Sequence, residues 1–546
     1  MAHPTADMVG RFGHRRVHDH RRRGDEELRA GTEARPERPS WLGSLPLPRP
    51  LALRWLSGGL LLTGAAVVAA WLLLAATHVD DRYRLDHVAG ARIALAQYLN
   101  DGTLYPSLYD GSAYGGTRFM PLPVVLHAAT ARLTGEYVVS GKLLAYGTML
   151  ALLGVTFILL RRMRCPFPIA VGLLAAVMTT WTGLVAGMGL RADSLPLLLQ
   201  LLAVAAVAGS RRPAATVAGA ALAALAFAAK LSAVWAPLAI CLWLAAVDRR
   251  RLAWFLTAYG VLVGGLLAFF AAASDGRIFE NVFGLSTAGL AGAGSLLPGP
   301  SSLIRLLADE ATAAWALLPV AGAATWLAAR QRQMSIYVVS LACCLLVLMV
   351  VLADVGTGGN QLIDLVVLTV LVVGELAGRS RSDPLASVAV PAGLAVVLLW
   401  VTVTGLVVTV GPDAREAVGM LRGTQLYSRQ PLSGQATPAT RLLSEDPYVP
   451  VSLGQRPVVL DPFMLRRLQD RDPAAVQRLA ERIRAREFEL VVLVEPLQPA
   501  DRDWWRDMHF GVPVTQALAD AYTDSGRAQG YYLYRPDPGG SSGGTG

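Results

Sequence analysis

Apolar residues recur in run after run between Trp55 and Val410, and this repetition restricts the chain to folds that place much of its length in lipid. Hydrophobic residues make up 53% of the chain and charged residues 16%, which is more apolar surface than a soluble core can bury. The pattern predicts a polytopic α-helical membrane protein with about eleven transmembrane helices. The runs are approximately Trp55–Ala76, Val138–Leu160, Ile169–Thr182, Leu195–Ala208, Ala214–Ala229, Leu231–Val247, Leu252–Ala273, Ala311–Ala329, Ile336–Ala353, Leu362–Ala377 and Leu385–Val410.

Arginines occupy every second connection between these runs, and cytoplasmic loops carry such an excess of basic residues. The basic connections hold Arg161, Arg162 and Arg164; Arg211 and Arg212; Arg249, Arg250 and Arg251; Arg330 and Arg332; and Arg379 and Arg381. The register predicts a multi-pass protein with a cytoplasmic N-terminus and an extracytoplasmic C-terminal segment, in the plasma membrane of a bacterium. The formal charge of +9 is explained by these clusters and does not indicate nucleic acid binding.

Composition divides the chain into four parts. We expect a disordered basic cytoplasmic tail over 1–50, a transmembrane domain over 51–410 with an outer loop over 77–137, an extracytoplasmic domain over 411–536, and a disordered tail over 537–546. The third part alternates β-like and helical stretches, which predicts a small α/β domain. The β-like stretches are Val458–Leu460, Leu490–Val494 and Tyr531–Tyr534, and the helical one is Pro473–Arg486.

Ionisable and amide side chains gather at the predicted outer ends of the helices, where their cost in lipid favours a functional role. These residues are Asp80, Asp81, Asp86, Arg191, Asp193, Lys230, Asn360, Gln361 and Asp364. Each also has a simpler interpretation. Arg191 and Asp193 fit an interfacial ion pair, Lys230 fits a side chain that reaches for the interface, and Asn360 fits a helix cap. Their occurrence on one side of the membrane is harder to attribute to chance.

The outer loop has too much pattern to be a simple tether. Residues Leu85–Leu99 show the spacing of an amphipathic helix lying on the membrane, and Asp101–Pro106 and Thr117–Pro123 follow. With Asp86, Gly102–Pro106, Pro121–Pro123 and the turns around Arg191, Lys230 and Asn360, the chain resembles the GT-C superfamily of membrane glycosyltransferases. The resemblance is to the protein mannosyltransferase and aminoarabinose transferase type and covers roughly residues 55–410. It differs in two places, because His87 follows Asp86 where the family often has Glu, and Leu122 splits the proline pair.

The resemblance implies transfer of a sugar from a polyprenyl-phosphate donor to a hydroxyl of a glycan, lipid or protein acceptor, with inversion. A carboxylate must take the acceptor's proton, and cations must stabilise the departing phosphate. We expect Asp86 to be the base, with Asp81 as a second candidate. Expected phosphate-binding residues are Arg191, Lys230, Arg92 and Arg118, and expected substrate-binding residues are Asp193, Tyr105, Asn360, Gln361 and Asp364. No cofactor is required by the sequence, and a divalent cation on the aspartates is left open.

Two other functions remain open from the sequence. A lipid or solute transporter or flippase would place its charges near the bilayer midplane and show an internal repeat, which is not evident here. A catalytically silent membrane scaffold with this fold is the third possibility, because the family's Asp-Glu pair is absent.

Overall fold

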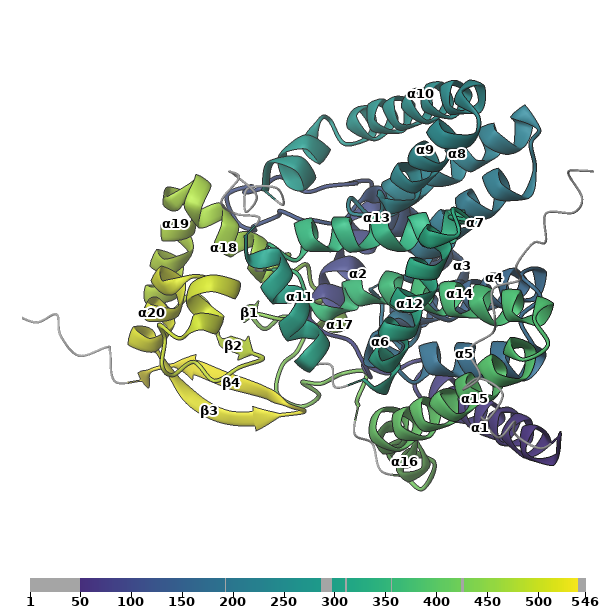
Figure 1. Cartoon of the computed structure of the whole chain (residues 1–546). Coiled ribbons are helices and arrows are strands. Elements are labelled where there is room, and N and C mark those ends of the chain that lie inside the picture. The colour runs from purple at the N-terminus through teal and green to yellow at the C-terminus, as the bar shows by residue number, and fades with distance from the viewer. Residues whose placement is uncertain are drawn as a thin grey trace, which may run out of the picture. The chain divides into compact units, whose positions relative to one another are not determined.

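The computed structural model describes residues 50–191, 193–285, 297–309, 312–354, 356–423 and 427–538 (Figure 1). The expected tail over 1–50 lies outside these ranges except for its last residue, and most of the tail over 537–546 does too.

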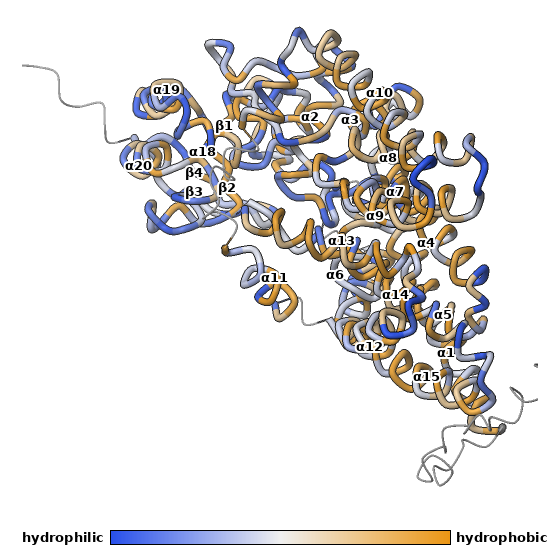
Figure 2. The backbone as a smooth tube through the Cα atoms, turned by 45° about the horizontal axis from the view of Figure 1, so that its top comes forward, coloured by the Kyte–Doolittle hydropathy of each residue, from blue (hydrophilic) through white to orange (hydrophobic). Residues whose placement is uncertain are grey.

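Every one of the predicted apolar runs forms helix, and much of the backbone of these helices is coloured orange, for hydrophobic residues, in Figure 2. They are α1 (Pro50–Thr77), α4 (Tyr137–Arg162), α5 (Phe167–Met178), α6 (Trp181–Met188), α7 (Ser194–Gly209), α8 (Pro213–Ala229), α9 (Trp235–Val247), α10 (Arg249–Ala273), α12 (Leu317–Arg330), α13 (Ile336–Val351), α14 (Ile363–Arg379) and α15 (Ala386–Gly405).

Helix length sets how many of these elements can cross a membrane. Among the described residues, five helices are long and apolar enough, or up to seven if each of two bent pairs is one span. α7, α8, α9 and α13 are apolar but shorter. The expected number of about eleven spans therefore stays a prediction.

One expected continuous helix is broken. The run Ile169–Thr182 divides into α5 and α6, whose axes differ by 76°. The cause is local, because Thr180 caps α6: its Oγ1 accepts a hydrogen bond from the Gly183 amide over 2.8 Å. The break turns the chain toward Arg191, in the connection between α6 and α7.

The outer loop folds into two helices, α2 (His87–Asn100) and α3 (Pro121–Thr134). The predicted helix over Leu85–Leu99 is confirmed, and its apolar residues are covered by other parts of the protein. Every residue from Ala89 to Ala96 is buried, so α2 packs inside the protein against α3, α4 and the C-terminal helix α17 (Tyr448–Ser452).

The last apolar helix does not end at Val410. α15 continues through a π-helical turn, Leu406–Val410, into α16 (Gly411–Leu421). Apart from α17, the C-terminal elements that follow are grouped at the left of Figure 1. They are β1 (Leu442–Ser444), α18 (Pro462–Arg471), α19 (Pro473–Arg484), β2 (Leu490–Leu493), α20 (Val512–Ala521), β3 (Tyr522–Ala528) and β4 (Tyr531–Pro536).

These C-terminal elements form the small α/β unit that the sequence predicts. The sheet has the order β1-β2-β4-β3, with β1 and β2 parallel and the other neighbours antiparallel. The expected strand at Val458–Leu460 is wrong, because only Val459 pairs, in an isolated bridge with Tyr114. That bridge joins the outer loop to the C-terminal unit: the Tyr114 amide donates to the Val458 carbonyl over 2.7 Å.

Candidate functional site

A cavity of about 740 Å³ lies where the outer loop, several helix ends and the C-terminal unit meet. Its apolar wall includes four residues of α13, residues at and before the start of α9, and residues of the outer loop and the C-terminal unit. Its polar wall consists of His87, Arg92, Arg118, Arg191, Asp193, Lys230, Ser232, Asp354, Thr357, Asn360, Gln361, Trp504 and His509. Residues separated by hundreds of positions in the sequence therefore share one hollow.

A chain of polar contacts connects the predicted residues on one side of this cavity. Arg191 forms an ion pair with Asp86 and donates a hydrogen bond through Nη1 to Asn360 Oδ1 over 3.1 Å. Asn360 Nδ2 donates to Asp193 Oδ2 over 2.9 Å, and Lys230 Nζ donates to Asp193 Oδ1 over 2.7 Å. The structure thus brings together the groups whose common location the sequence predicts.

Helix ends place each of these side chains. Asp86 caps the N-terminus of α2, where its Oδ1 accepts the Ala89 amide hydrogen over 3.0 Å. Asp193 directly precedes α7, Lys230 follows the last residue of α8, and Asn360 lies in the short 3₁₀ turn before α14. Four separate helix ends therefore lie close together, and each contributes one side chain to the site.

Charge at the site is predominantly positive. Burial opposes the cationic form of Arg191, but the Asp86 and Asp193 carboxylates outweigh it and raise the pKa of Arg191. Burial lowers the pKa of Arg92 to about 10, which still leaves it charged at neutral pH. Burial, together with the neighbouring ring of His509 and the charges of Arg118 and Arg191, holds the pKa of His87 well below its usual value. An anionic group would be stabilised in such surroundings.

Arg92 and Arg118 approach the cavity from the outer loop. Arg92 Nη1 donates to the Leu190 carbonyl over 2.8 Å, which ties α2 to the turn that carries Arg191. Arg118 Nη1 donates to the Gly356 carbonyl over 3.2 Å, and its Nε lies 3.5 Å from Asp461 Oδ2. Arg118 therefore connects the outer loop both to the residues before α14 and to the C-terminal unit.

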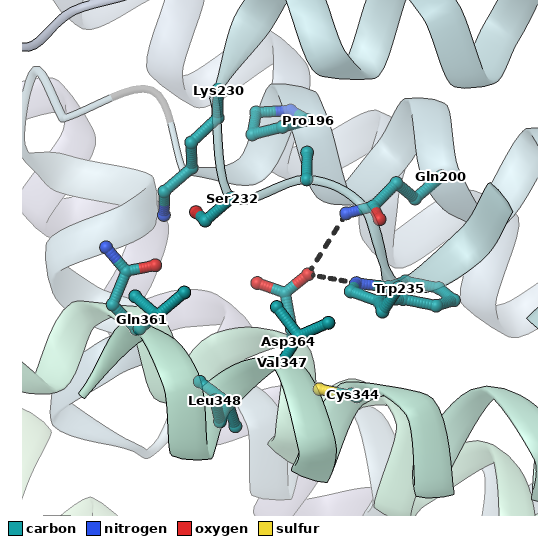
Figure 3. A pocket seen from close by; sticks show the side chains of 12 residues that line it. Pro196, Gln200, Lys230, Ser232, Trp235, Cys344, Val347, Leu348, Gln361 and Asp364 are labelled. Atoms are coloured by element: carbon teal, nitrogen blue, oxygen red, sulfur yellow. Dashed lines mark hydrogen bonds between the residues drawn. The ribbon is translucent and has the colours of Figure 1, made fainter. Parts of the chain in front are cut away.

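Asp364 lies in an adjoining small pocket, shown in Figure 3. Its Oδ1 accepts hydrogen bonds from Trp235 Nε1 over 2.7 Å and from Gln200 Nε2 over 3.4 Å. Lys230, Ser232 and Gln361 line both this pocket and the large cavity. Asp364 is therefore placed behind the cavity wall rather than on it.

Three other predicted residues are not among those that line the cavity. Asp86 is one of them, and its connection to the cavity is its ion pair with the wall residue Arg191; Asp81 and Tyr105 lie further apart. Asp81 is buried, its Oδ2 lies 2.6 Å from His78 Nδ1, and its Oδ1 accepts from the Tyr83 amide over 2.8 Å. Tyr105 is fully buried, and its hydroxyl donates to the Phe119 carbonyl over 2.9 Å. Both contacts are structural, and a role of either residue with substrate stays a prediction.

The C-terminal unit supplies wall residues that the sequence alone did not single out. These are Phe463, Met464, Trp504, Met508 and His509, and the outer loop adds His87. His87 could have been found from its place directly after Asp86. Nothing in the periodicity of the C-terminal segment marks the others, because their position depends on how that segment packs on the outer loop.

A metal site is not evident in the parts of the chain that the structure describes. Within them, no group of three or more His, Cys, Asp or Glu side chains is close enough to hold an ion. The Asp86 carboxylate instead contacts Arg191. The divalent cation that the sequence leaves open stays a prediction.

Solved structures share this fold. ArnT from Cupriavidus metallidurans in the apo state is 14% identical, with a TM-score of 0.54 over 86% of this chain and 97% of that chain. The same protein bound to undecaprenyl phosphate is 13% identical, with a TM-score of 0.51 over 88% and 99%. An oligosaccharyltransferase from Archaeoglobus fulgidus, in the apo form, is 12% identical, with a TM-score of 0.50 over 89% and 75%.

These neighbours are membrane glycosyltransferases of the GT-C superfamily, so the fold that the sequence resemblance implies is confirmed. At such low identities the likeness is one of fold. No protein-family model matches the chain, and no curated protein matches it.

Proposed function

We propose that this chain, which has the fold of the GT-C membrane glycosyltransferases, transfers a sugar from a polyprenyl-phosphate donor to an acceptor hydroxyl. The observation that carries the proposal is a cavity lined by four cationic side chains, one of which, Arg191, forms an ion pair with Asp86. A fold neighbour with undecaprenyl phosphate bound adds support.

The cavity suits an amphipathic donor. Arg92, Arg118, Arg191 and Lys230 offer hydrogen bonds and positive charge to a phosphate. Apolar residues of the same wall would accommodate an isoprenoid chain. Those apolar residues are Leu231, Val234, Leu238, Leu346, Val347, Val350 and Val351. A soluble nucleotide sugar has no apolar chain that would contact these residues.

Asp86 is the proposed general base. Its carboxylate takes the proton from the acceptor hydroxyl, whose oxygen bonds to the anomeric carbon of the sugar. The bond from that carbon to the phosphate oxygen breaks, its electron pair leaves with the polyprenyl phosphate, and the anomeric configuration inverts. A donor phosphate at Arg191 would compete with Asp86 for the guanidinium, which frees a carboxylate oxygen to accept the proton. Asp81 remains the second candidate.

The sugar would be held by the polar residues between the cations. Asn360, Gln361 and Asp193 offer donors and acceptors to its hydroxyls. The wall from the C-terminal unit supports a role of that unit in contacting the acceptor, which is a glycan, a lipid or a protein. Whether the sugar is a hexose or a pentose is decided by which labelled donor supports transfer.

The proposed location is the outer face of a bacterial plasma membrane, with the N-terminus in the cytoplasm. Arginines from two of the basic connections line a second cavity together with Gln331 and Gln333 of a third. They are Arg162, Arg164, Arg379 and Arg381. Their gathering at one place supports a single cytoplasmic end for these loops.

The test uses the full-length protein in lipid nanodiscs with undecaprenyl-phosphate-linked radiolabelled hexoses and pentoses. Acceptors are octyl glycosides, lipid A and hydroxyl-containing peptides. We expect transfer by the native protein and a loss of about 10²- to 10⁴-fold in Asp86→Asn, the range typical of a missing general base. Asparagine caps a helix as well as aspartate does, so the folding of this variant should be retained.

Asp81→Asn is the matched comparison, since Asp81 lies in the same loop but contacts His78 and the Tyr83 amide, whereas Asp86 contacts the cavity residue Arg191. Full activity in this variant and loss in Asp86→Asn would assign the base to Asp86, and the reverse would assign it to Asp81. No transfer with any donor and acceptor, from protein that folds and binds undecaprenyl phosphate, would overturn the proposal in favour of a silent scaffold.

A further inference from the structure

His509 and Glu445 form a fully buried pair in the C-terminal unit. His509 Nδ1 lies 2.6 Å from Glu445 Oε1, and neither side chain is exposed to solvent. Glu445 directly follows β1, and His509 follows the π-helical turn Trp504–Met508. The pair therefore joins two parts of the C-terminal unit at the cavity.

Glu445 fixes the orientation and tautomer of this imidazole. Its carboxylate also accepts hydrogen bonds from Trp504 Nε1 over 2.8 Å and from the Val494 amide over 2.7 Å. A carboxylate surrounded by donors requires His509 Nδ1 to carry a hydrogen. In the neutral ring, Nε2 is then a hydrogen-bond acceptor.

That acceptor atom has no protein partner. His509 Nε2 is buried and without a hydrogen bond among the described residues, although His509 lines the large cavity. Buried polar atoms are normally paired, so an unpaired one at a cavity wall points to a partner that arrives with a ligand.

The surroundings place this atom beside the predicted reaction centre. The His509 ring lies 4.3 Å from that of His87, the residue after Asp86, and 4.5 Å from that of Trp504. His87 and Trp504 line the same cavity. The C-terminal unit therefore reaches the side of the cavity on which Asp86 contacts Arg191.

We propose that His509 Nε2 accepts a hydrogen bond from a hydroxyl of a sugar substrate, and that Glu445 holds the ring in position for it. This inference rests on the proposed sugar transfer and adds a substrate-binding residue to it. A lone-pair acceptor calls for a ligand that donates, which a hydroxyl does and a phosphate does not. The cations Arg118 and Arg191 remain available for the phosphate.

The decisive variant is His509→Asn. The asparagine amide nitrogen can take the place of Nδ1 and keep the bond to Glu445, but nothing replaces Nε2. The matched control is His127→Gln, whose amide nitrogen can replace the buried His127 Nε2 that contacts the Tyr137 carbonyl. His127 does not line the large cavity. Thermal unfolding of each variant would identify any general loss of structure.

Three measurements separate the sources of the hydroxyl in the nanodisc assay. We expect the KM for an octyl glycoside acceptor to rise about three- to tenfold in His509→Asn, the effect of one lost neutral hydrogen bond. A similar rise in the KM for the lipid-linked sugar instead would assign the hydroxyl to the donor. No change in either would overturn the proposal, as would weaker binding of undecaprenyl phosphate alone, which carries no sugar.

Direct binding keeps the inference testable if the native protein transfers nothing. Radiolabelled octyl glycosides would then be titrated onto the native protein and onto His509→Asn. Weaker binding by the variant supports the hydroxyl site even though the proposed transfer has failed. Equal binding, or no binding to either protein, refutes the hydroxyl site.

Discussion

Asn360 donates a hydrogen bond from Nδ2 to Asp193 Oδ2 over 2.9 Å, although 167 positions separate the two residues. The other end of the same amide accepts from Arg191 Nη1. Asn360 therefore uses a donor toward a carboxylate and an acceptor toward a guanidinium. A carboxylate at this position could serve Arg191 but would repel Asp193.

Replacing Asn360 should show this two-sided role. We expect Asn360→Ala to lower kcat/KM for transfer about 10- to 100-fold, since each lost contact involves a charged partner. Asn360→Asp should lower it further, because it adds repulsion to the lost donor. Steady-state transfer rates in nanodiscs measure both. An aspartate variant more active than the alanine variant would show that the contact with Arg191 alone matters.

The helices between Trp55 and Val410 could largely be predicted because most of the apolar helices there contain an apolar run of their own. The division of Ile169–Thr182 at Thr180 could not, since a capping threonine inside an apolar run looks like one more tolerated polar residue. Strands β2 and β4 carry visible apolar runs, but β1 and β3 do not. The exposed β3 reads Tyr-Thr-Asp-Ser-Gly-Arg-Ala and is held by its pairing with β4. β1 and β3 therefore form strands because they pair with neighbouring strands, and their local sequence does not predict them.

The site, like the fold, could be predicted only in part. Arg191, Asp193, Lys230 and Asn360 stand out because charge and amides are unusual beside apolar runs. Their meeting follows if all these ends lie on one side. His509 lies in a segment of ordinary soluble composition, where a histidine has no such contrast. Its place at the cavity follows from its contacts with Glu445 and with the rings of His87 and Trp504, which no sequence pattern predicts.

Lys230 should contribute strongly to donor binding. Its side chain is mostly buried and its Nζ contacts Asp193, so Lys230→Gln removes a positive charge from a partly dehydrated wall. We expect undecaprenyl phosphate to bind about 10- to 100-fold more weakly, as for a lost charge-assisted hydrogen bond. Equilibrium binding in nanodiscs measures this.

Arg211→Gln is the control for Lys230→Gln. Arg211 is exposed in the connection between α7 and α8, at the end of α8 opposite Lys230. The variant should bind undecaprenyl phosphate as the native protein does. If both variants weaken binding equally, general charge rather than a specific contact attracts the lipid.

Gly90 lies where α2 packs closely against the C-terminal unit. A Cβ at this position would lie 2.5 Å from both Asp446 Oδ1 and the Tyr448 amide nitrogen. Gly90→Ala should therefore force the two apart and lower the free energy of unfolding by about 1 to 3 kcal/mol. Thermal unfolding and transfer activity should both decline.

Gly147→Ala provides the comparison for Gly90→Ala. Gly147 is also helical, in α4, but a Cβ there meets nothing within 4 Å. This variant should be as stable as the native protein, since alanine has the higher helix propensity. Equal stability of the two variants would mean that α2 can move away from the C-terminal unit at no cost.

Asp446 should make the stability of the C-terminal unit depend on pH. Burial raises the pKa of Asp446 from 3.8 to about 6, against the opposing effect of the hydrogen bonds from Tyr531 and the Tyr448 amide. Between these two values the folded state keeps a proton that the unfolded state has lost, so the stabilising contribution of this carboxyl group is full below about pH 4 and is lost as the pH rises through 6. Asp446→Asn cannot ionise and should keep its hydrogen bonds. Unfolding followed by fluorescence should therefore show the native protein losing up to about 3 kcal/mol relative to this variant between pH 4 and pH 7. A constant difference between the two proteins over that range would mean that Asp446 keeps its ordinary pKa in the folded state.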